Sequence, residues 1–223
     1  MTNPTFDFER EYWEQGILLI AGLDEAGMGA LAGPVVASAV LFNRRSEIPM
    51  PNTQYPIRDS KTLSAGQREK AETWIKENAL AWAVGEASVD EITELNIRGA
   101  AHLAMRRAVE QLYCSPDLLL IDGNPVQIHN SIPSVSIVGG DGLSFSIAAA
   151  SILAKVHRDR ILTALDKEYP VYGFAGHKGY GSAGHMDALR KHGPCKWHRP
   201  TYRPVRILRE VSMTNTEYRK NHQ

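Results

Sequence analysis

Several features are scarce in this 223-residue sequence, and each scarcity narrows what the protein can be. The formal net charge is zero, so the whole molecule has no field that would attract a polyanion. Cys114 and Cys195 are the only cysteines and match no paired-ligand motif, which favours free thiols in a reducing compartment. No apolar run reaches the ~20 residues of a membrane span, and residues 1–15 lack the basic start and apolar core of a signal peptide. We therefore expect a cytoplasmic protein that does not associate with membranes.

Internal repeats and low-complexity segments are also missing. The length and the 43% hydrophobic content fit one large domain with a substantial core. Charge is nevertheless unevenly distributed, because the stretch from Lys155 to Arg209 has twelve Lys or Arg residues against four Asp or Glu residues. A basic C-terminal third in a chain that also has an acidic site fits a nuclease better than the neutral total suggests.

One stretch near the N-terminus organises the rest of the chain. The apolar run Ile17–Leu23 predicts a buried strand that ends in Asp24 and Glu25, and Val35–Phe42 predicts its partner strand. Between them lie Gly27, Gly29 and Gly33, which let a backbone or a ligand approach closely. Carboxylates at the end of a core strand are unfavourable unless a cation meets them. The pattern therefore indicates a metal-loaded acidic site beside bare main chain, although Asp24 could also simply cap a turn.

Two later apolar runs also lead to acids. Residues 117–122 predict a strand that ends in Asp122, and the short strand Val135–Val138 is followed by Asp141. Strand ends gather at one edge of an open sheet, so we expect these acids to meet Asp24 and Glu25. Neighbouring strand residues point to opposite faces, so Glu25 joins Asp24 only if the strand already turns there. Oxygen-only ligands favour Mg²⁺ or Mn²⁺, and two such ions about 4 Å apart suit phosphodiester cleavage. The alternative is that some of these acids only cap loops.

Hydrophobic spacing and capping residues predict the remaining elements. We expect a helix from the Ser64 N-cap to Asn78, a strand over Leu80–Val89, a short helix from Asp90 to Leu95, a longer one over Ile97–Leu112, a long helix from Ser146 to about Tyr169, a helix from Ser182 to His192, and an extended segment over His198–Val205.

Seven blocks of this sequence, in order, resemble the bacterial ribonuclease HII family, and together they cover roughly residues 15–207. They are residues 22–27 (GLDEAG), 31–37 (LAGPVVA), 59–63 (DSKTL), 121–123 (IDG), 146–156 with Arg158 and Asp159, 177–181 (HKGYG), and 198–199 (HR). The resemblance implies an α/β, ribonuclease H-like fold with a five-stranded mixed sheet, flanking helices and a basic helical C-terminal extension. It implies one catalytic domain over residues 1–209, whose basic helical segment spans about 170–209, and a flexible tail over 210–223.

The resemblance also implies an activity. Similar enzymes cut the RNA strand of RNA–DNA hybrids and incise on the 5′ side of single ribonucleotides in duplex DNA, leaving 3′-hydroxyl and 5′-phosphate ends. They use two metal ions, so Mg²⁺ or Mn²⁺ is the expected cofactor. The expected partners are RNA–DNA hybrids and ribonucleotide-containing duplex DNA, and we expect a monomer. Two alternatives stay open: a catalytically weakened nucleic-acid-binding relative, and a nuclease of the same fold that acts on DNA alone.

Position by position, the resemblance assigns the metal-binding and catalytic acids to Asp24, Glu25, Asp122 and Asp141. The segment Gly27–Met28–Gly29 matches the loop that reads the 2′-hydroxyl, the group that separates RNA from DNA at one residue. Tyr180 matches the tyrosine that stacks under the neighbouring deoxyribose.

Other residues carry weaker expectations. We expect the following to contact nucleic-acid backbone: Ser60, Lys61, His177, Lys178 and Arg199. The alternatives are a helix-entry turn for the first two, a solvated loop for the next two, and pairing with core acids for Arg199. Asp159 is expected to pair with a neighbouring basic group. A zinc site at His185, His192, Cys195 and His198 is disfavoured, because their spacing fits no paired-ligand pattern.

Two positions depart from the family pattern. Met28 stands where the family usually has Arg, and Gly139 stands where it usually has Lys, two residues before the last acid. Each change removes a cation beside phosphate and metal, and losing one charged hydrogen bond costs about 1.5–3 kcal/mol. We therefore expect weaker action on substrate or an altered junction preference.

Overall fold

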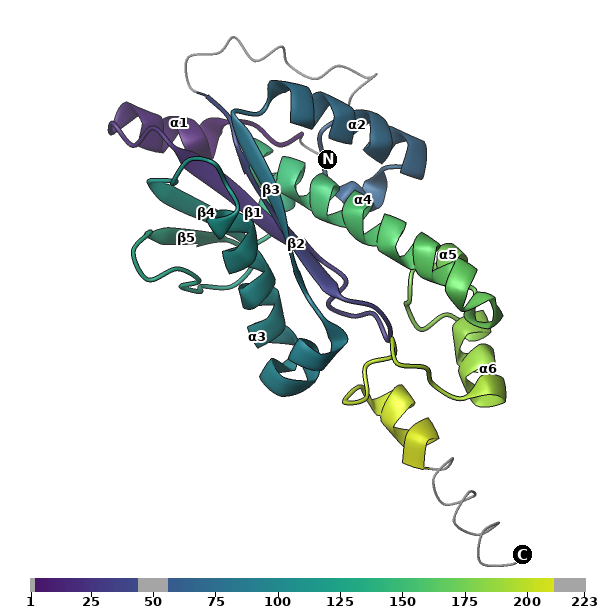
Figure 1. Cartoon of the computed structure of the whole chain (residues 1–223). Coiled ribbons are helices and arrows are strands. Elements are labelled where there is room, and N and C mark those ends of the chain that lie inside the picture. The colour runs from purple at the N-terminus through teal and green to yellow at the C-terminus, as the bar shows by residue number, and fades with distance from the viewer. Residues whose placement is uncertain (1–2, 44–55, 211–223) are drawn as a thin grey trace, which may run out of the picture. The chain divides into compact units, whose positions relative to one another are not determined.

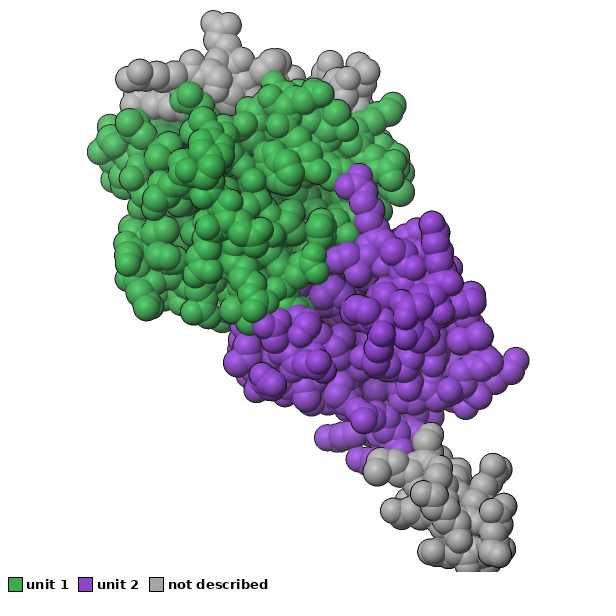
Figure 2. Space-filling model, viewed as in Figure 1, with its two compact units in different colours: residues 1–26, 36–87, 101–157 green, residues 27–35, 88–100, 158–223 purple. Residues whose placement is uncertain are grey.

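The structure is a computed structural model that describes residues 3–43 and 56–210. Its chain divides into two compact units, coloured separately in Figure 2. The first unit comprises Met1–Ala26, Val36–Ala87 and Ala101–His157, and the second comprises Gly27–Val35, Ser88–Ala100 and Arg158–Gln223. The single catalytic domain predicted from the sequence stays a prediction, and the predicted tail lies outside the described residues apart from Glu210.

The first unit is built on a five-stranded sheet with the strand order β3-β2-β1-β4-β5 (Figure 1). The strands are β1 (Ile20–Ala26), β2 (Val35–Leu41), β3 (Ala81–Ala87), β4 (Leu118–Asp122) and β5 (Ser134–Ile137). Strand β1 is antiparallel to β2 but parallel to β4, with Ile20 opposite Leu118, and β4 is parallel to β5. This confirms the predicted mixed sheet, and the carboxyl ends of β1, β4 and β5 share one edge.

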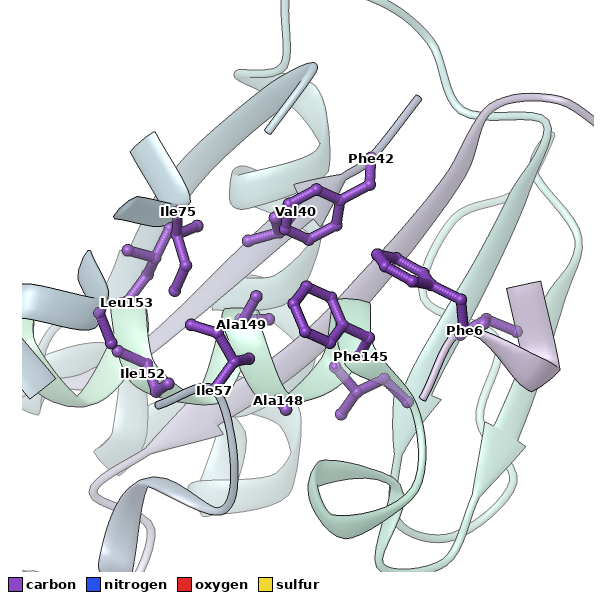
Figure 3. Close-up of a cluster of buried hydrophobic side chains, with 14 of the residues drawn as sticks. Phe6, Val40, Phe42, Ile57, Ile75, Phe145, Ala148, Ala149, Ile152 and Leu153 are labelled. Carbon is purple, nitrogen blue, oxygen red and sulfur yellow. The ribbon is translucent and has the colours of Figure 1, made fainter. Parts of the chain in front are cut away.

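Apolar side chains from the strands and from three helices form the main core of this unit. The helices are α1 (Asp7–Glu14), α2 (Ala65–Asn78) and α4 (Phe145–Glu168). Figure 3 shows Phe6 and Phe42 around Phe145, with Ile152 and Leu153 further along the same cluster. The Phe6 and Phe145 ring centroids lie 4.4 Å apart. The strands also bury their alternate residues, such as Leu119 and Ile121, so both faces of the central sheet are covered.

The helices follow the predicted boundaries closely. Ser64 caps α2 in a reciprocal capping box with Gln67, as its sequence position predicts. Helix α3 (Val89–Glu110) is interrupted at Asn96, whose φ of 59° separates the short and long helices that were expected there. Helix α1 was not predicted. None of the helices in the described part of the chain combines the length and apolar composition of a transmembrane segment.

The second unit has its own small core. It contains η3 (Pro170–Tyr172), α5 (Phe174–His177) and α6 (Ala183–His192), which Ser182 caps as predicted. Leu162, Phe174, Leu189 and Val205 are buried there around the turn that carries Leu31 and Ala32. Residues 203–210 are helical, so the prediction of an extended segment up to Val205 was wrong for its last residues. The first helical turn follows Tyr202, and Val205 buries its side chain in this core.

Candidate functional site

Three of the four predicted acids converge at the shared edge of the sheet. Asp24 lies in β1, Asp122 ends β4, and Asp141 lies in the turn η2 (Gly140–Gly142) that follows β5. One carboxylate oxygen from each lies within 4.8 Å of the others. The parallel pairing of β1, β4 and β5 explains this convergence, because it brings all three carboxyl ends to the same side.

The backbone around η2 holds the carboxylate of Asp122. The Gly140 N–H donates to Oδ1 of Asp122 at 2.7 Å. A Cβ on Gly140 would lie 2.7 Å from Cδ1 of Ile147, so a side chain there would require the end of the Ile147 side chain to move. The hydrogen bond from Gly140 therefore joins the turn that carries Asp141 to the carboxylate of Asp122.

The cluster is electrostatically strained as it stands. Burial raises the pKa of Asp24 well above its ordinary value, and the charge of Glu25 raises it further. Burial also raises the pKa of Asp122, assisted by the charge of Asp141 and opposed by the hydrogen bond from Gly140. Carboxylates that hold protons more tightly than usual lack a cation to compensate them. This donor set, made of oxygen atoms only, fits a hard divalent cation.

Glu25 stands slightly apart from the other acids. Strand β1 continues to Ala26, so Glu25 is a strand residue, and it is not among the three residues whose ligand oxygens come together. It still interacts electrostatically with the cluster: burial and then the charge of Asp122 raise the pKa of Glu25 to about 7. Its N–H donates to Oδ1 of Asp24 at 2.7 Å. The metal-binding role of Glu25 remains a prediction.

Lys61 and Ser60 lie in the turn η1 (Ser60–Thr62) of the same unit and differ in exposure. The Lys61 ammonium lies 3.5 Å from Oδ2 of Asp141, and its side chain is 77% exposed. Burial alone would lower the pKa of Lys61, but Asp141 and other nearby acids outweigh it and raise it. Ser60 is instead buried, and its hydroxyl lies 3.0 Å from that of Ser151. Its predicted contact with phosphate is therefore not available in this structure.

In the second unit, the segment Gly27–Pro34 is held from inside by two buried arginines. Arg199 donates to the carbonyls of Met28, Gly33 and Pro34 at 3.0–3.1 Å. Tyr202 also donates to the Met28 carbonyl. Arg199 is fully buried, so its guanidinium is not available to a duplex phosphate, and its hydrogen bonds go to carbonyls and the Tyr202 hydroxyl rather than to core acids.

The segment His177–Gly181 contains the other predicted contact residues. His177 uses both ring nitrogens internally, near the Tyr172 carbonyl at 2.8 Å and the Gly179 N–H at 3.2 Å. Lys178 donates from its ammonium to the Thr163 hydroxyl at 2.7 Å. Tyr180 is 38% exposed and presents a large aromatic surface to solvent. Of these predicted contacts, Tyr180 is the most available to a ligand.

Two of the three histidines considered for zinc, His185 and His198, form a hydrogen-bonded chain instead. The Cys195 N–H donates to Nδ1 of His198 at 2.9 Å, so the proton of neutral His198 is on Nε2. That atom lies 3.0 Å from Nε2 of His185, whose Nδ1 lies 2.9 Å from the Tyr180 carbonyl. Within residues 3–43 and 56–210, the only group of possible metal ligands that comes together is the acidic one.

Two buried residues of α4 belong with these sites, although the sequence analysis assigned neither of them a role. The hydroxyl of Ser151 hydrogen-bonds to Asp24, and Arg158 donates to the carbonyls of Ala32, Pro34 and Lys178 at 2.9–3.1 Å. Both lie on the buried face of the helix, with Ala154 and Leu162 at a spacing of four residues from Arg158. A charge on an apolar helical stripe was the available signal for Arg158.

Known proteins resemble this chain in sequence. A model of the family Ribonuclease HII matches residues 21–205. The ribonuclease HII of Endomicrobium trichonymphae is 49% identical over 206 residues, which is 92% of this chain and 95% of that protein. The ribonuclease HII of Albidiferax ferrireducens is 51% identical over 194 residues, which is 86% of this chain and 90% of that protein.

Solved structures resemble it in fold. The ribonuclease H2 from Pyrococcus horikoshii OT3 has a TM-score of 0.70 at 24% identity, over 87% of this chain and 98% of its own. Bst-RNase HIII in complex with Mn²⁺ has a TM-score of 0.67 at 18% identity, over 87% of this chain and 70% of its own. These likenesses show the ribonuclease H-like fold. Because the family model spans most of its length and its relatives share about half of its residues, the chain belongs to the ribonuclease HII family of metal-dependent endoribonucleases.

Proposed function

We propose that this chain hydrolyses the RNA strand of RNA–DNA hybrids and nicks duplex DNA on the 5′ side of single embedded ribonucleotides, leaving 3′-hydroxyl and 5′-phosphate ends. The reaction uses two divalent cations, Mg²⁺ or Mn²⁺, held by Asp24, Glu25, Asp122 and Asp141. The enzyme acts as a cytoplasmic monomer. The observation that carries this proposal is the convergence of Asp24, Asp122 and Asp141, with ligand oxygens within 4.8 Å of one another.

The acids fit hard cations on physical grounds. Their raised pKa values reflect negative charge that the buried edge of the sheet does not compensate. Two bound cations would supply that compensation and stabilise the attacking and leaving oxygens of the phosphodiester. The protein's own part is to hold these carboxylates in a fixed arrangement, which Gly140 and Ser151 support through hydrogen bonds.

The loop Gly27–Met28–Gly29 is suited to read a 2′-hydroxyl through its main chain. The Met28 carbonyl points to Arg199 and Tyr202 inside the second unit. In a trans peptide the N–H points opposite to the carbonyl, so the Gly29 N–H is directed away from these side chains. Gly29 is exposed, and a Cβ there would meet nothing within 4 Å. The 2′-hydroxyl of a ribose could therefore approach this donor, whereas a deoxyribose has no 2′-oxygen to offer it.

Met28 and Gly139, the two departures from the family pattern, weaken binding of the nucleic-acid substrate. Met28 offers a thioether where a guanidinium would bind phosphate, and Gly139 offers no side chain at all. Gly139 has a φ of 69°, and a Cβ there would meet nothing within 4 Å, so its conformation rather than space restricts a replacement. We propose that substrate binding or junction choice, rather than the metal site, is what these positions change.

A nicking assay tests the proposal. A 5′-labelled duplex with one ribonucleotide, an RNA–DNA hybrid and an all-DNA duplex are each incubated with Mg²⁺, with Mn²⁺ and with a chelator. We expect cleavage of the first two, none of the third, and complete loss with the chelator. Extension of the nicked strand by a DNA polymerase checks for the 3′-hydroxyl.

Two outcomes of the same assay favour the other candidates. Binding without cleavage of either ribonucleotide-containing duplex would identify a weakened relative, for which Met28 and Gly139 are the motivating observation. Equal cleavage of all-DNA and single-ribonucleotide duplexes would identify a DNA nuclease on the same fold. Either result contradicts the proposal.

A further inference from the structure

Arg158 joins two segments of the second unit that are far apart in sequence. It is fully buried, and its three guanidinium nitrogens each donate to a different main-chain carbonyl. Nε donates to Pro34 at 3.1 Å and Nη2 donates to Ala32 at 3.0 Å, both in the glycine segment. Nη1 donates to Lys178 at 2.9 Å, in the segment that contains Tyr180. One side chain thus fixes the distance between the two segments.

Glycines make this arrangement possible. A Cβ on Gly27 would lie 2.0 Å from Nε of Arg158, and the φ of Gly27 is +97°, so no other residue fits there without moving the guanidinium. A Cβ on Gly179 would lie 2.6 Å from the Ala32 carbonyl oxygen. The Leu31 N–H donates to the Gly179 carbonyl at 2.8 Å, so the two segments also touch directly. The glycine pattern therefore serves the packing around Arg158 as well as any ligand.

The same guanidinium lies against the ring of Tyr180. Cζ of Arg158 is 5.4 Å from the ring centroid, a distance at which a cation attracts an aromatic face. Arg158 therefore contacts the residue proposed to stack on deoxyribose and supports the loop proposed to read the 2′-hydroxyl.

We propose that Arg158 is a positioning residue that holds Gly27–Gly29 and Tyr180 at one fixed separation, so that recognition of a single ribonucleotide requires both at once. This inference rests on the proposed function of those two elements. A hybrid with several ribonucleotides offers a 2′-hydroxyl at each neighbouring residue, so its cleavage depends less on this separation. Arg158 should then affect the junction substrate more than the hybrid.

Lysine is the informative replacement at this position. Arg158→Lys keeps a positive charge but loses the planar fork that reaches three carbonyls. Arg199 donates to Met28, Gly33, Pro34 and the Tyr202 hydroxyl, and to neither Lys178 nor Tyr180, so it does not bridge the two segments. Arg160→Lys, an exposed position two residues further along α4, is the matched control.

The experiment compares kcat/KM on a single-ribonucleotide duplex and on a plain RNA–DNA hybrid. A small misplacement of a recognition group can cost on the order of a hundredfold, so we expect Arg158→Lys to lose at least ~10-fold more on the junction duplex than on the hybrid. Arg160→Lys should match the parent on both. Tyr180→Ala alone should lower junction cleavage, and adding Arg158→Lys to it should cause little further loss, because both changes disable the same device.

A second measurement separates this inference from the proposed function. In hydrogen–deuterium exchange of the free protein, Arg158→Lys should speed exchange in residues 27–34 and 177–181 together and leave β1 and β4 unchanged. Failure of the parent to nick the junction duplex would refute the proposed function, and the exchange result would still decide whether Arg158 couples the segments. The inference would be overturned if Arg158→Lys lost equal kcat/KM on both substrates, or if its loss and that of Tyr180→Ala were additive. It would also be overturned if hydrogen–deuterium exchange were unchanged, or if Arg158→Lys did not fold.

Discussion

The two units of this protein treat buried charge in opposite ways. In the first unit, Asp24, Asp122 and Asp141 come together, and burial, assisted by neighbouring negative charges, raises the pKa values of Asp24 and Asp122. In the second unit, Arg158 and Arg199 are fully buried, but main-chain carbonyls accept their hydrogen bonds. The acidic cluster is therefore incomplete without a cation, whereas the arginines are satisfied within their own unit.

This difference distinguishes charged residues that can bind a ligand from charged residues that stabilise the fold. A charge left uncompensated by the fold is available to an external ligand, and the acids at the sheet edge have that character. A charge already bonded to carbonyls stabilises a loop and has little left to offer a ligand. The predicted phosphate contact of Arg199 fails on this ground, since its hydrogen bonds end at carbonyls and the Tyr202 hydroxyl.

The largest expected effect comes from neutralising an acid of the cluster. Asp24→Asn should lower cleavage by at least ~1000-fold, because metal ions supply several kcal/mol of transition-state stabilisation. The same change should raise the free energy of unfolding without metal, because the raised pKa of Asp24 marks a charge that the fold disfavours. Single-turnover cleavage and urea unfolding check both effects.

Asp117→Asn is the control for that change. Asp117 directly precedes β4, at the end opposite Asp122, and accepts the Leu19 N–H at 3.0 Å. Asp117→Asn should leave the cleavage rate equal to that of the parent protein. If Asp24→Asn keeps parental activity, the acidic cluster is not the catalytic centre.

Removing a buried arginine should lower the free energy of unfolding, the opposite of the effect expected for Asp24→Asn. Arg199→Met leaves the Gly33 carbonyl without its donor and removes one of the two donors to the Pro34 carbonyl, and it should lower the free energy of unfolding by about 3 kcal/mol. Urea unfolding measures this, with the exposed Arg206→Met as control. A stability equal to the parent's would mean that the arginine is dispensable for the loop.

Local signals in the sequence were sufficient for much of the fold. Ser64 and Gln67 form the capping box expected of their spacing, Asn96 interrupts α3, and parallel strands deliver three acids to one edge. These features depend on neighbours in sequence or on strand periodicity.

Residues whose partners lie far away in sequence were the ones missed. Helix α1 buries Glu9 together with Trp13, and a charge on the buried face hides the apolar stripe. Glu9 is accommodated because the Ser144 hydroxyl and the Ser146 N–H donate to it, 135 and 137 residues away. Arg158 was missed for the same reason, since its carbonyl partners belong to two distant segments.

Acid should weaken the second unit through its histidine chain. Burial and then the charge of His185 lower the pKa of His198 to about 4, so the folded state keeps it neutral. The unfolded chain binds this proton near its ordinary value of 6.5, so stability is full above that pH and falls as pH drops towards 4. One such group accounts for at most about 3 kcal/mol.

Urea unfolding between pH 7.5 and pH 4.5 measures the slope of the free energy of unfolding against pH. His198→Asn keeps an acceptor for the Cys195 N–H but cannot titrate, so its slope should be flatter than the parent's. Identical slopes would show that His198 is not the group responsible.

The smallest expected change restores a cation at the glycine loop. Met28→Arg should raise kcat/KM on the single-ribonucleotide duplex ten- to a hundredfold, because one charged hydrogen bond contributes about 1.5–3 kcal/mol. Met28→Lys tests whether charge alone is sufficient. Unchanged rates and unchanged cleavage position in Met28→Arg would refute the idea that this departure weakens substrate binding.

The most direct test of the contrast between the units is thermal unfolding with and without divalent metal. A cation that binds only the folded state at a hundred times its Kd stabilises by about 2.7 kcal/mol. We predict that Mg²⁺ or Mn²⁺ raises the Tm of the parent and of Arg199→Met, but not that of Asp24→Asn. If neither metal shifts the parent, or if Asp24→Asn shifts as much as the parent does, the acids do not hold the metal.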